Sequence, residues 1–457
     1  MTSSYRGRLF RAGVLLSWMS LGTASTTTAE PQRDSTLTLH EAVRLGLEYH
    51  PTVRAARASE ADAAAQVGQA LAQRLPQFLG QASLIHFEEP MIVAPFHRLD
   101  LSTPPRFEET LVQGQLSLGY TLFDGGARGA TINGARARQE VTAARRESAE
   151  MTLIADVAGA YLQVLSAHGM LAAQDQSLDA LHAERERVRR LFAEGQAARV
   201  ELLRVDAAIA QAEAERIATA AELDTGERRL ARLLGVEPER TRASRLTGVR
   251  LIDTVVAVDR TALIGRFEST SPDLEAARQL SQAANWGRRA AIAAWFPRLE
   301  VVGGYILFGS AAGDFTGEWQ GGVRLSYPVF TGGARARAVA AASARLSVAR
   351  ERYRLAELGG REAIDRAVSA IRQHRAQVEA IATAVDHLVE VARIEQLALE
   401  AGAGTQTDFL TADAELRRAR AGLVQARHAE IAAWVQLATT TGELSSSWLD
   451  HMVETVR

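Results

Sequence analysis

Cysteine and lysine are both absent from the 457 residues, so all 52 basic residues are arginine. The absence of cysteine excludes disulfides, thiol catalysis and cysteine metal sites, and we expect no lipid anchor on cysteine. The absence of lysine excludes a P-loop lysine, a Schiff-base lysine and a serine–lysine dyad. Several classes of enzyme are therefore ruled out, and stability is expected to come from packing.

The sequence also lacks an excess of charge of one sign, because 52 basic residues nearly balance 54 acidic ones and the formal net charge is -2. Such a balance gives no field that would attract nucleic acid, which is not an expected partner. The ten histidines show no ligand pair at helical spacing, and no catalytic carboxylate pair or nucleotide loop stands out. We therefore expect no metal, no cofactor and no enzymatic activity.

No apolar run is long enough for a membrane-spanning helix, which needs about 20 residues. The run from Ala12 to Leu21 follows three arginines and precedes small residues. This order predicts a secretory signal peptide over 1–29, cleaved after Ala24 or Ala29. If the mature chain meets a membrane, we expect it to do so through β-strands.

The remaining sequence contains an internal repeat. The segment Phe123–Arg128 recurs as Phe330–Arg335 at an offset of 207 positions, and upstream the offset is 221. The first copy therefore has 14 extra residues, expected in an enlarged loop between 90 and 105. A fixed offset over such a length predicts tandem structural repeats. The expected division is an N-terminal periplasmic segment 30–50, a first repeat 51–235, an inter-repeat equatorial segment 236–271, a second repeat 272–442 and a tail 443–457.

Each repeat contains a region of alternating polarity, expected to form strands at about 77–123 and about 298–330. From Val112 to Phe123 apolar and small or polar residues alternate, and the equivalent stretch of the second repeat does the same. Period two over about ten residues suits a tilted membrane-spanning strand. Of the 26 aromatic residues, 14 fall in residues 77–123 and 295–330. The strands alone leave open a soluble sandwich with an aromatic core.

Long proline-free tracts follow the strands. Proline costs about 3 kcal/mol inside a helix, so its absence predicts continuous helices over 127–194 and 334–401. Each would extend about 100 Å at 1.5 Å per residue. The Gly359-Gly360 pair is expected to mark a bend or a change in packing. Apolar residues recur at spacings of three and four residues in these tracts, which predicts coiled-coil packing. Gly195 and Gly402 are expected to end the two tracts, so that each tract and the helix after it form a helical hairpin.

Acidic residues recur six positions after each turn glycine, at Glu201 and Asp408. One interpretation is that they stabilise the helix N-termini through the helix dipole, by about 0.3–1 kcal/mol. The other is that several copies of the chain place them in a ring that favours cations in a narrow pore. Periodicity leaves both interpretations open.

Two hairpins give four strands, fewer than the eight with which closed membrane barrels begin. Open strand edges in lipid leave unpaired backbone groups, each costing several kcal/mol. Three chains together would supply twelve strands. The predicted fold is thus mainly α with a small β part: tandem long coiled-coil hairpins plus four strands contributing to a trimeric 12-stranded transmembrane β-barrel.

These features resemble the TolC-like outer membrane efflux proteins from Leu39 to about Gly442. The resemblance rests on the tandem copies, the Phe-x-Gly-Gly start of each long helix, the His50-Pro51 and Ser271-Pro272 helix starts, and the turn segment Ala401–Ala412. It implies a homotrimer with a barrel in the outer membrane and helices crossing the periplasm.

The resemblance further implies the duct of a tripartite efflux or type I secretion system. The implied partners are a periplasmic adaptor protein, an inner-membrane pump of the RND, ABC or MFS type, and outer membrane lipid. The arginine that ties neighbouring helices in some members falls at Gly404. A periplasmic coiled-coil scaffold that forms no channel is the alternative. The implied pore constriction is Asp408, Glu201 and Thr411, and the implied adaptor-facing tip is Gly195, Val200, Leu203, Gly402, Thr405 and Leu410.

Overall fold

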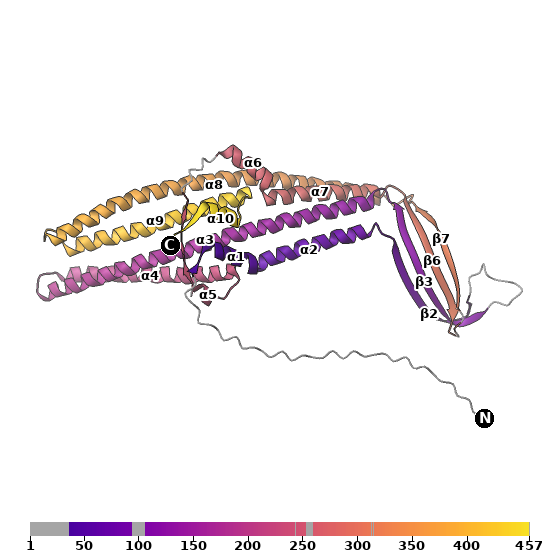
Figure 1. Cartoon of the computed structure of the whole chain (residues 1–457), viewed down its shortest axis with the longest axis horizontal. Coiled ribbons are helices and arrows are strands. Elements are labelled where there is room, and N and C mark those ends of the chain that lie inside the picture. The colour runs from indigo at the N-terminus through magenta and orange to yellow at the C-terminus, as the bar shows by residue number, and fades with distance from the viewer. Residues whose placement is uncertain are drawn as a thin grey trace, which may run out of the picture.

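The computed structural model describes residues 36–93, 106–242, 244–252, 259–311, 313 and 315–456. The expected signal peptide and most of the expected enlarged loop lie outside these residues. The described chain forms a long rod of helices with a small sheet at one end (Figure 1). The expected combination of long helical hairpins and four main strands is confirmed.

The two repeats have the same order of elements. In each, a helix of 22 residues leads into two strands, a helix of 67 residues and a returning helix of 36 residues. The first repeat contains α2 (Pro51–Ala72), β2 (Gln77–Ile92), β3 (Phe107–Phe123), α3 (Ala127–Ala193) and α4 (Arg199–Leu234). The second contains α7 (Pro272–Ala293), β6 (Arg298–Ser310), β7 (Phe315–Ser326), α8 (Ala334–Glu400) and α9 (Gln406–Thr441).

Short elements flank the repeats around the middle of the rod (Figure 1). The bounds are β1 (Thr36–Leu37), α1 (Leu39–Tyr49), α5 (Pro238–Arg242), β4 (Arg245–Leu246), β5 (Gly248–Leu251), α6 (Arg260–Thr270), α10 (Ser446–Met452) and β8 (Val453–Val456). The largest buried cluster lies here, around the ring of Tyr161. Its hydroxyl lies 2.7 Å from the Leu37 carbonyl and 2.8 Å from that of Thr247, so it links the long helix α3 to these flanking elements.

Local sequence explains where the helices begin. Pro51 and Pro272 occupy the first turns of α2 and α7, where the missing N–H has no helical partner to lose. The residues before them, His50 and Ser271, accept backbone N–H bonds through their side chains. Before α3 and α8 stand glycine pairs with positive φ, a conformation that other residues rarely adopt.

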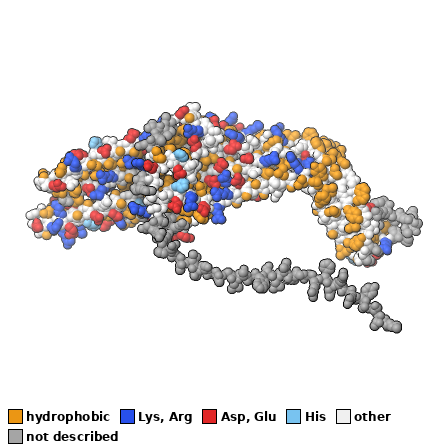
Figure 2. Space-filling model, viewed as in Figure 1, with side chains coloured by type: hydrophobic (Ala, Val, Ile, Leu, Met, Phe, Trp, Pro, Cys, Tyr) orange, Lys and Arg blue, Asp and Glu red, His pale blue; other side chains and the backbone are white. Residues whose placement is uncertain are grey.

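The sheet has the order β2-β3-β6-β7 with every pair antiparallel. Its apolar side chains are exposed: Leu84 is 69%, Val323 65% and Trp319 81% accessible. Figure 2 shows hydrophobic side chains covering this end of the molecule. The sheet packs on no second sheet within the described residues, so the soluble sandwich with an aromatic core is wrong.

The helices follow the expected long tracts, and α8 runs through the Gly359-Gly360 pair without a break. A side chain at Gly360 would collide with the ring of Phe267 on α6. The pair therefore marks a packing site, because only hydrogen at Gly360 lets the ring rest on the helix backbone. None of the described helices is both long enough and apolar enough to cross a membrane.

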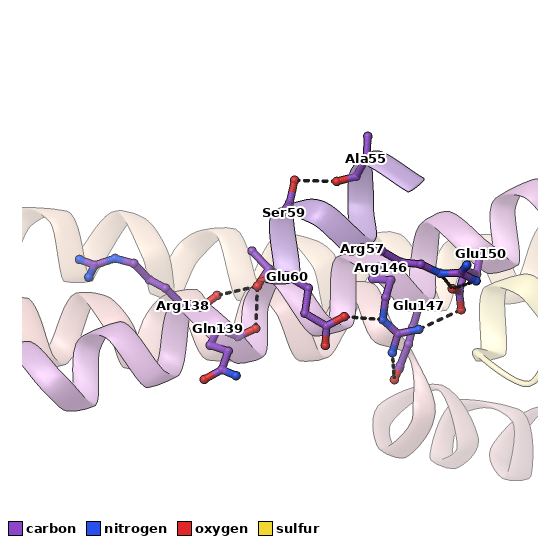
Figure 3. Close-up of polar contacts among 10 residues, drawn as sticks. Ala55, Arg57, Ser59, Glu60, Arg138, Gln139, Arg146, Glu147 and Glu150 are labelled. Carbon is purple, nitrogen blue, oxygen red and sulfur yellow. Dashed lines mark hydrogen bonds and ion pairs between the residues drawn. The ribbon is translucent and has the colours of Figure 1, made fainter. Parts of the chain in front are cut away.

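Salt bridges join α2 to α3 on their facing surfaces (Figure 3). Arg146 on α3 contacts Glu60 of α2 at 2.7 Å and Glu150 of its own helix at 3.0 Å. Arg57 of α2 contacts the same Glu150 at 3.0 Å. Burial lowers the pKa of Arg146, but the carboxylates of Glu150 and Glu60 outweigh it and the net pKa is raised. This network orients α2 on α3 within the first repeat.

Candidate functional site: the tip of the helical hairpins

Both hairpin turns lie at the end of the rod away from the sheet (Figure 1). In the first turn, Gly195 has φ +76°, and the N–H of Gln196 bonds to the Leu191 carbonyl at 2.8 Å. In the second, Gly402 has φ +71° and the chain likewise bonds back onto the last turn of α8. Glycine at positive φ ends a helix in this way without steric cost, so the two expected turn glycines are located correctly.

The second turn is closely packed. The Gly404 N–H donates to the Ala398 carbonyl at 2.9 Å, and a Cβ at Gly404 would lie 2.9 Å from the Cβ of Ala398. A side chain here would require the turn to shift. The local packing thus explains why glycine occupies the position at which the family resemblance implied an arginine.

Thr405 and Asp408 form a reciprocal helix cap at the start of α9. The Asp408 N–H donates to Thr405 Oγ1 at 3.2 Å, and the Thr405 N–H donates to Asp408 Oδ2 at 3.4 Å. The Thr405 hydroxyl also donates to that carboxylate at 2.6 Å. Such a capping box satisfies backbone donors that the helix leaves unpaired. In one chain Asp408 thus stabilises the helix start, while both side chains remain exposed.

Glu201 has a different environment from Asp408, although the repeat places them at equivalent positions. The residue before α4 is Ala198, which provides no side-chain cap. The Glu201 carboxylate is exposed, and its charge contributes to raising the pKa of Arg187 on α3. The hydrogen bonds that Arg187 donates to Glu184 are the largest cause of that rise in pKa. Glu201 therefore belongs electrostatically to a polar cluster that the sequence did not reveal.

That cluster joins the two hairpins. The Thr407 hydroxyl on α9 donates to Glu184 Oε1 on α3 at 2.5 Å, and Arg187 donates to the same carboxylate at 2.6 and 2.8 Å. Arg187 also donates to Thr407 Oγ1 at 3.0 Å. Glu184 is only 3% exposed. Its burial raises the pKa of the carboxyl, but the bonds from Arg187 and Thr407 outweigh burial and hold the pKa below its usual value.

Glu184 was missed because acidic and basic residues alternate around it in the sequence. A signal was nevertheless present: Leu178, Leu181 and Val188 form an apolar stripe at helical spacing, and Glu184 occupies a position on that stripe. A charge on the buried stripe of a coiled coil requires a partner. The position of Thr407 in a different hairpin, however, cannot be read from this spacing.

Two more polar contacts join α3 to α9 between the tip and the middle of the rod. Arg417 donates to Gln176, and Ser166 lies 2.7 Å from Nδ1 of His428. His428 is 8% exposed, and burial lowers its pKa to about 4. The imidazole is therefore neutral near pH 7 and can share a hydrogen bond with the serine.

The remaining expected tip residues divide between the two turns. Val200 and Leu203 are 51% and 56% exposed on α4. Leu410 is half-buried on α9 and Thr411 is exposed. The structure brings Thr405 to Asp408 and places all the expected tip residues at one end of the rod. Within the described residues no group of acidic or histidine side chains is arranged to hold a metal ion.

Comparisons with known proteins agree with this architecture. The family model described as outer membrane efflux protein matches residues 42–236 and 263–443, which is most of the chain. The chain therefore belongs to the outer membrane efflux protein family. It is accordingly a protein of the outer membrane with a large periplasmic portion, and its family is one of efflux proteins rather than enzymes.

The individual relatives have low sequence identity to this chain, but the similarity extends over most of its length. The outer membrane efflux protein BepC of Brucella suis is 24% identical over 377 residues, covering 80% of this chain and 79% of BepC. The structure of the outer membrane protein VceC of Vibrio cholerae gives a TM-score of 0.73 at 21% identity, covering 88% of this chain and 96% of VceC. The Campylobacter jejuni CmeC outer membrane channel gives 0.74 at 17% identity, covering 90% and 88%. At these identities the structural likeness concerns the fold.

Proposed function

We propose that this protein is the outer membrane duct of a tripartite efflux or type I secretion system. Three copies would close a barrel of twelve strands in the outer membrane, and their helices would form a conduit across the periplasm. The observation that carries this proposal is the division of the rod: an apolar, exposed sheet with two open edges at one end, and two helical turns at the other.

The open edges support assembly of several copies. β2 and β7 each have one neighbour in the sheet, so each presents a row of backbone groups without a strand partner within the described chain. In lipid such groups cost several kcal/mol each, and closure into a barrel removes that cost. Because the chain belongs to an outer membrane family, the backbone groups at the edges of its sheet need such partners.

The helical tip would receive a periplasmic adaptor and, through it, an inner-membrane pump of the RND, ABC or MFS type. The exposed side chains of Val200 and Leu203 support this assignment, because burying them against a partner protein would favour binding. Gly195, Gly402, Thr405 and Leu410 complete the proposed surface. Asp408, Glu201 and Thr411 would line the narrowest part of the conduit, where the two carboxylates would favour cations.

Site-directed crosslinking tests this function. With no native cysteine in the chain, Leu203→Cys gives a single attachment point for a photo-crosslinker in the periplasm of the native cell. Ile217→Cys is the matched control, because Ile217 is also on α4, 67% exposed and about 20 Å further from the turn. We expect mass spectrometry to identify a pump adaptor at Leu203 and much less of it at Ile217.

Two results together would contradict the proposal that the protein is a duct: no adaptor is captured at Leu203, and the protein is released from membranes without detergent. A scaffold of coiled coil that forms no channel would then be favoured.

A further inference from the structure

The main sheet has a polar face as well as the apolar one. Side chains alternate between the two faces of a strand, so Arg324 and Gln320 of β7 lie on the face away from the exposed apolar Val323 and Trp319. The polar face borders an open hollow of about 800 Å³ beside the start of α3. Polar side chains from all four main strands line this hollow, among them Gln77, Gln115, Thr121, Arg298, Glu300 and Gln320.

Most of the charges around the hollow are paired. Arg298 Nε of β6 lies 2.7 Å from Glu300 Oε1 on the same strand. Arg298 also donates to the Thr121 hydroxyl of β3 at 3.2 Å, and that hydroxyl lies 3.4 Å from Glu300 Oε1. Arg128, at the start of α3, is paired with Asp124 at 2.9 Å. These two arginines and two carboxylates therefore cancel one another.

Arg324 is the charge that remains without a partner. It stands directly opposite Glu300 in the ladder of β6 and β7, but the Glu300 carboxylate is engaged by Arg298. Within the described residues Arg324 forms no hydrogen bond or ion pair, and its side chain is exposed.

The next acid on the polar face of β7 does not compensate Arg324. This acid is Glu318, six residues away, or about 20 Å along the strand at about 3.3 Å per residue. That separation exceeds the screening length of about 10 Å at 0.1 M salt. The end of the polar face next to the helices thus carries one uncompensated positive charge per chain.

The repeats provide a comparison within the chain. The charges that the strands bring to the hollow all come from the second repeat. The offsets of 207 and 221 residues map Arg324 to Ser117 and Arg298 to Gln77, which are neutral. The first repeat forms the same pair of strands with these neutral side chains. Folding of the hairpin therefore does not require an arginine at the position of Arg324.

Closure of the proposed barrel would bring three copies of Arg324 to one level of its lumen. Twelve strands spaced about 4.8 Å apart and tilted by about 40° form a ring about 24 Å across. Long side chains on the polar face reach into such a ring from three sides. Rings of arginine favour anions in pores, and the planar guanidinium matches the oxygens of carboxylate and phosphate groups.

We propose that Arg324 forms an anion site at the helix end of the barrel, and that the cargo of the duct carries an oxyanion group, such as carboxylate, phosphate or sulfate, which this site binds in transit. The inference rests on the proposed function and adds a class of cargo to it. The tip carboxylates do not oppose it, because α8 alone, with 67 residues, separates the two ends by about 100 Å.

Block of single-channel current tests the site. Pyrenetetrasulfonate, a probe with four sulfonate groups, is added to planar bilayers containing the full-length protein, on the side opposite the helical rod. We expect it to lower the current in a concentration-dependent way. Arg324→Gln should raise the half-blocking concentration at least about tenfold, because a trimer loses three charges. Ser117→Gln is the matched control at the equivalent position of the first repeat, and it should leave the block unchanged.

A second variant separates charge from other effects of the substitution. Arg324→Lys keeps the positive charge, so its half-blocking concentration should stay close to that of the unmodified protein. Equal half-blocking concentrations in Arg324→Lys and Arg324→Gln would overturn the anion site, because the charge would then not be the cause of the block.

The remaining outcomes separate this inference from the proposed function. Discrete currents that the probe leaves unblocked, or that it blocks equally well in Arg324→Gln, overturn the anion site and leave the duct intact. Absence of any current from the unmodified protein, together with a monomeric mass in detergent, overturns the duct and the anion site with it.

Discussion

Thr407 on α9 donates its hydroxyl hydrogen to the buried carboxylate of Glu184 on α3 at 2.5 Å, although 223 residues separate them in sequence. The bond connects the two hairpins close to their turns. Because Glu184 also pairs with Arg187, a change at Thr407 removes one of several bonds and leaves the charge paired. The tip of the rod is therefore held by polar contacts as well as apolar packing.

Replacing Thr407 by valine should loosen the tip. A hydrogen bond to a charged group contributes about 1.5–3 kcal/mol, so amides in the first turns of α9 should exchange at least about tenfold faster. Hydrogen exchange with mass spectrometry measures this directly. Thr411→Val is the control, because Thr411 is exposed on the same helix. Equal exchange in the two variants would show that the Thr407 bond contributes nothing.

The buried histidine predicts acid sensitivity of the rod. The pKa of His428 is lowered from 6.5 to about 4 on folding, so the unfolded chain binds more protons between these values. Its contribution to stability is complete above about pH 6.5 and is lost as the pH falls toward 4. We expect the melting temperature to fall between pH 7 and pH 4.5, and to fall less in His428→Gln. The same slope in both proteins would mean that other groups cause it.

The two interpretations of Asp408 can be separated by one substitution. Asp408→Asn keeps a side-chain oxygen for the capping box and removes the charge at the helix N-terminus, so helix stability should fall by only about 0.3–1 kcal/mol. If carboxylates line the conduit, the cation preference measured from reversal potentials in a bilayer should weaken. Selectivity identical to that of the unmodified protein would leave Asp408 as a helix cap alone.

The adjacent glycines of α8 should respond in opposite directions. Gly360→Ala places a methyl group against the Phe267 ring and should destabilise the protein by about 1–3 kcal/mol. At Gly359 the built Cβ meets open space, so Gly359→Ala should stabilise the helix by up to about 1 kcal/mol. Urea unfolding compares the two. Destabilisation of equal size at both positions would contradict the packing explanation.

Much of this architecture could be predicted from sequence because its signals are local. The lack of proline gave the long helix from Ala127, expected to end at Glu194 and observed to end at Ala193. Gly195 and Gly402 marked the turns because positive φ strongly favours glycine. Alternation over Val112–Phe123 indicated a strand that the structure extends to Phe107.

Contacts between distant segments could not be predicted in the same way. The Gly359-Gly360 pair signalled something special in α8, but a bend and a packing site were equally compatible with it. Choosing between them required knowing that α6 places Phe267 there. The bond from Thr407 to Glu184 likewise depends on how α3 and α9 align, which helix periodicity alone does not fix.

The most direct measurement of the proposed duct is current through planar bilayers containing the purified full-length protein. We expect discrete, cation-preferring unitary currents from a species whose mass, measured in the same detergent, is three times that of the chain. Absence of any current, together with protein that stays monomeric and soluble without detergent, would contradict the duct.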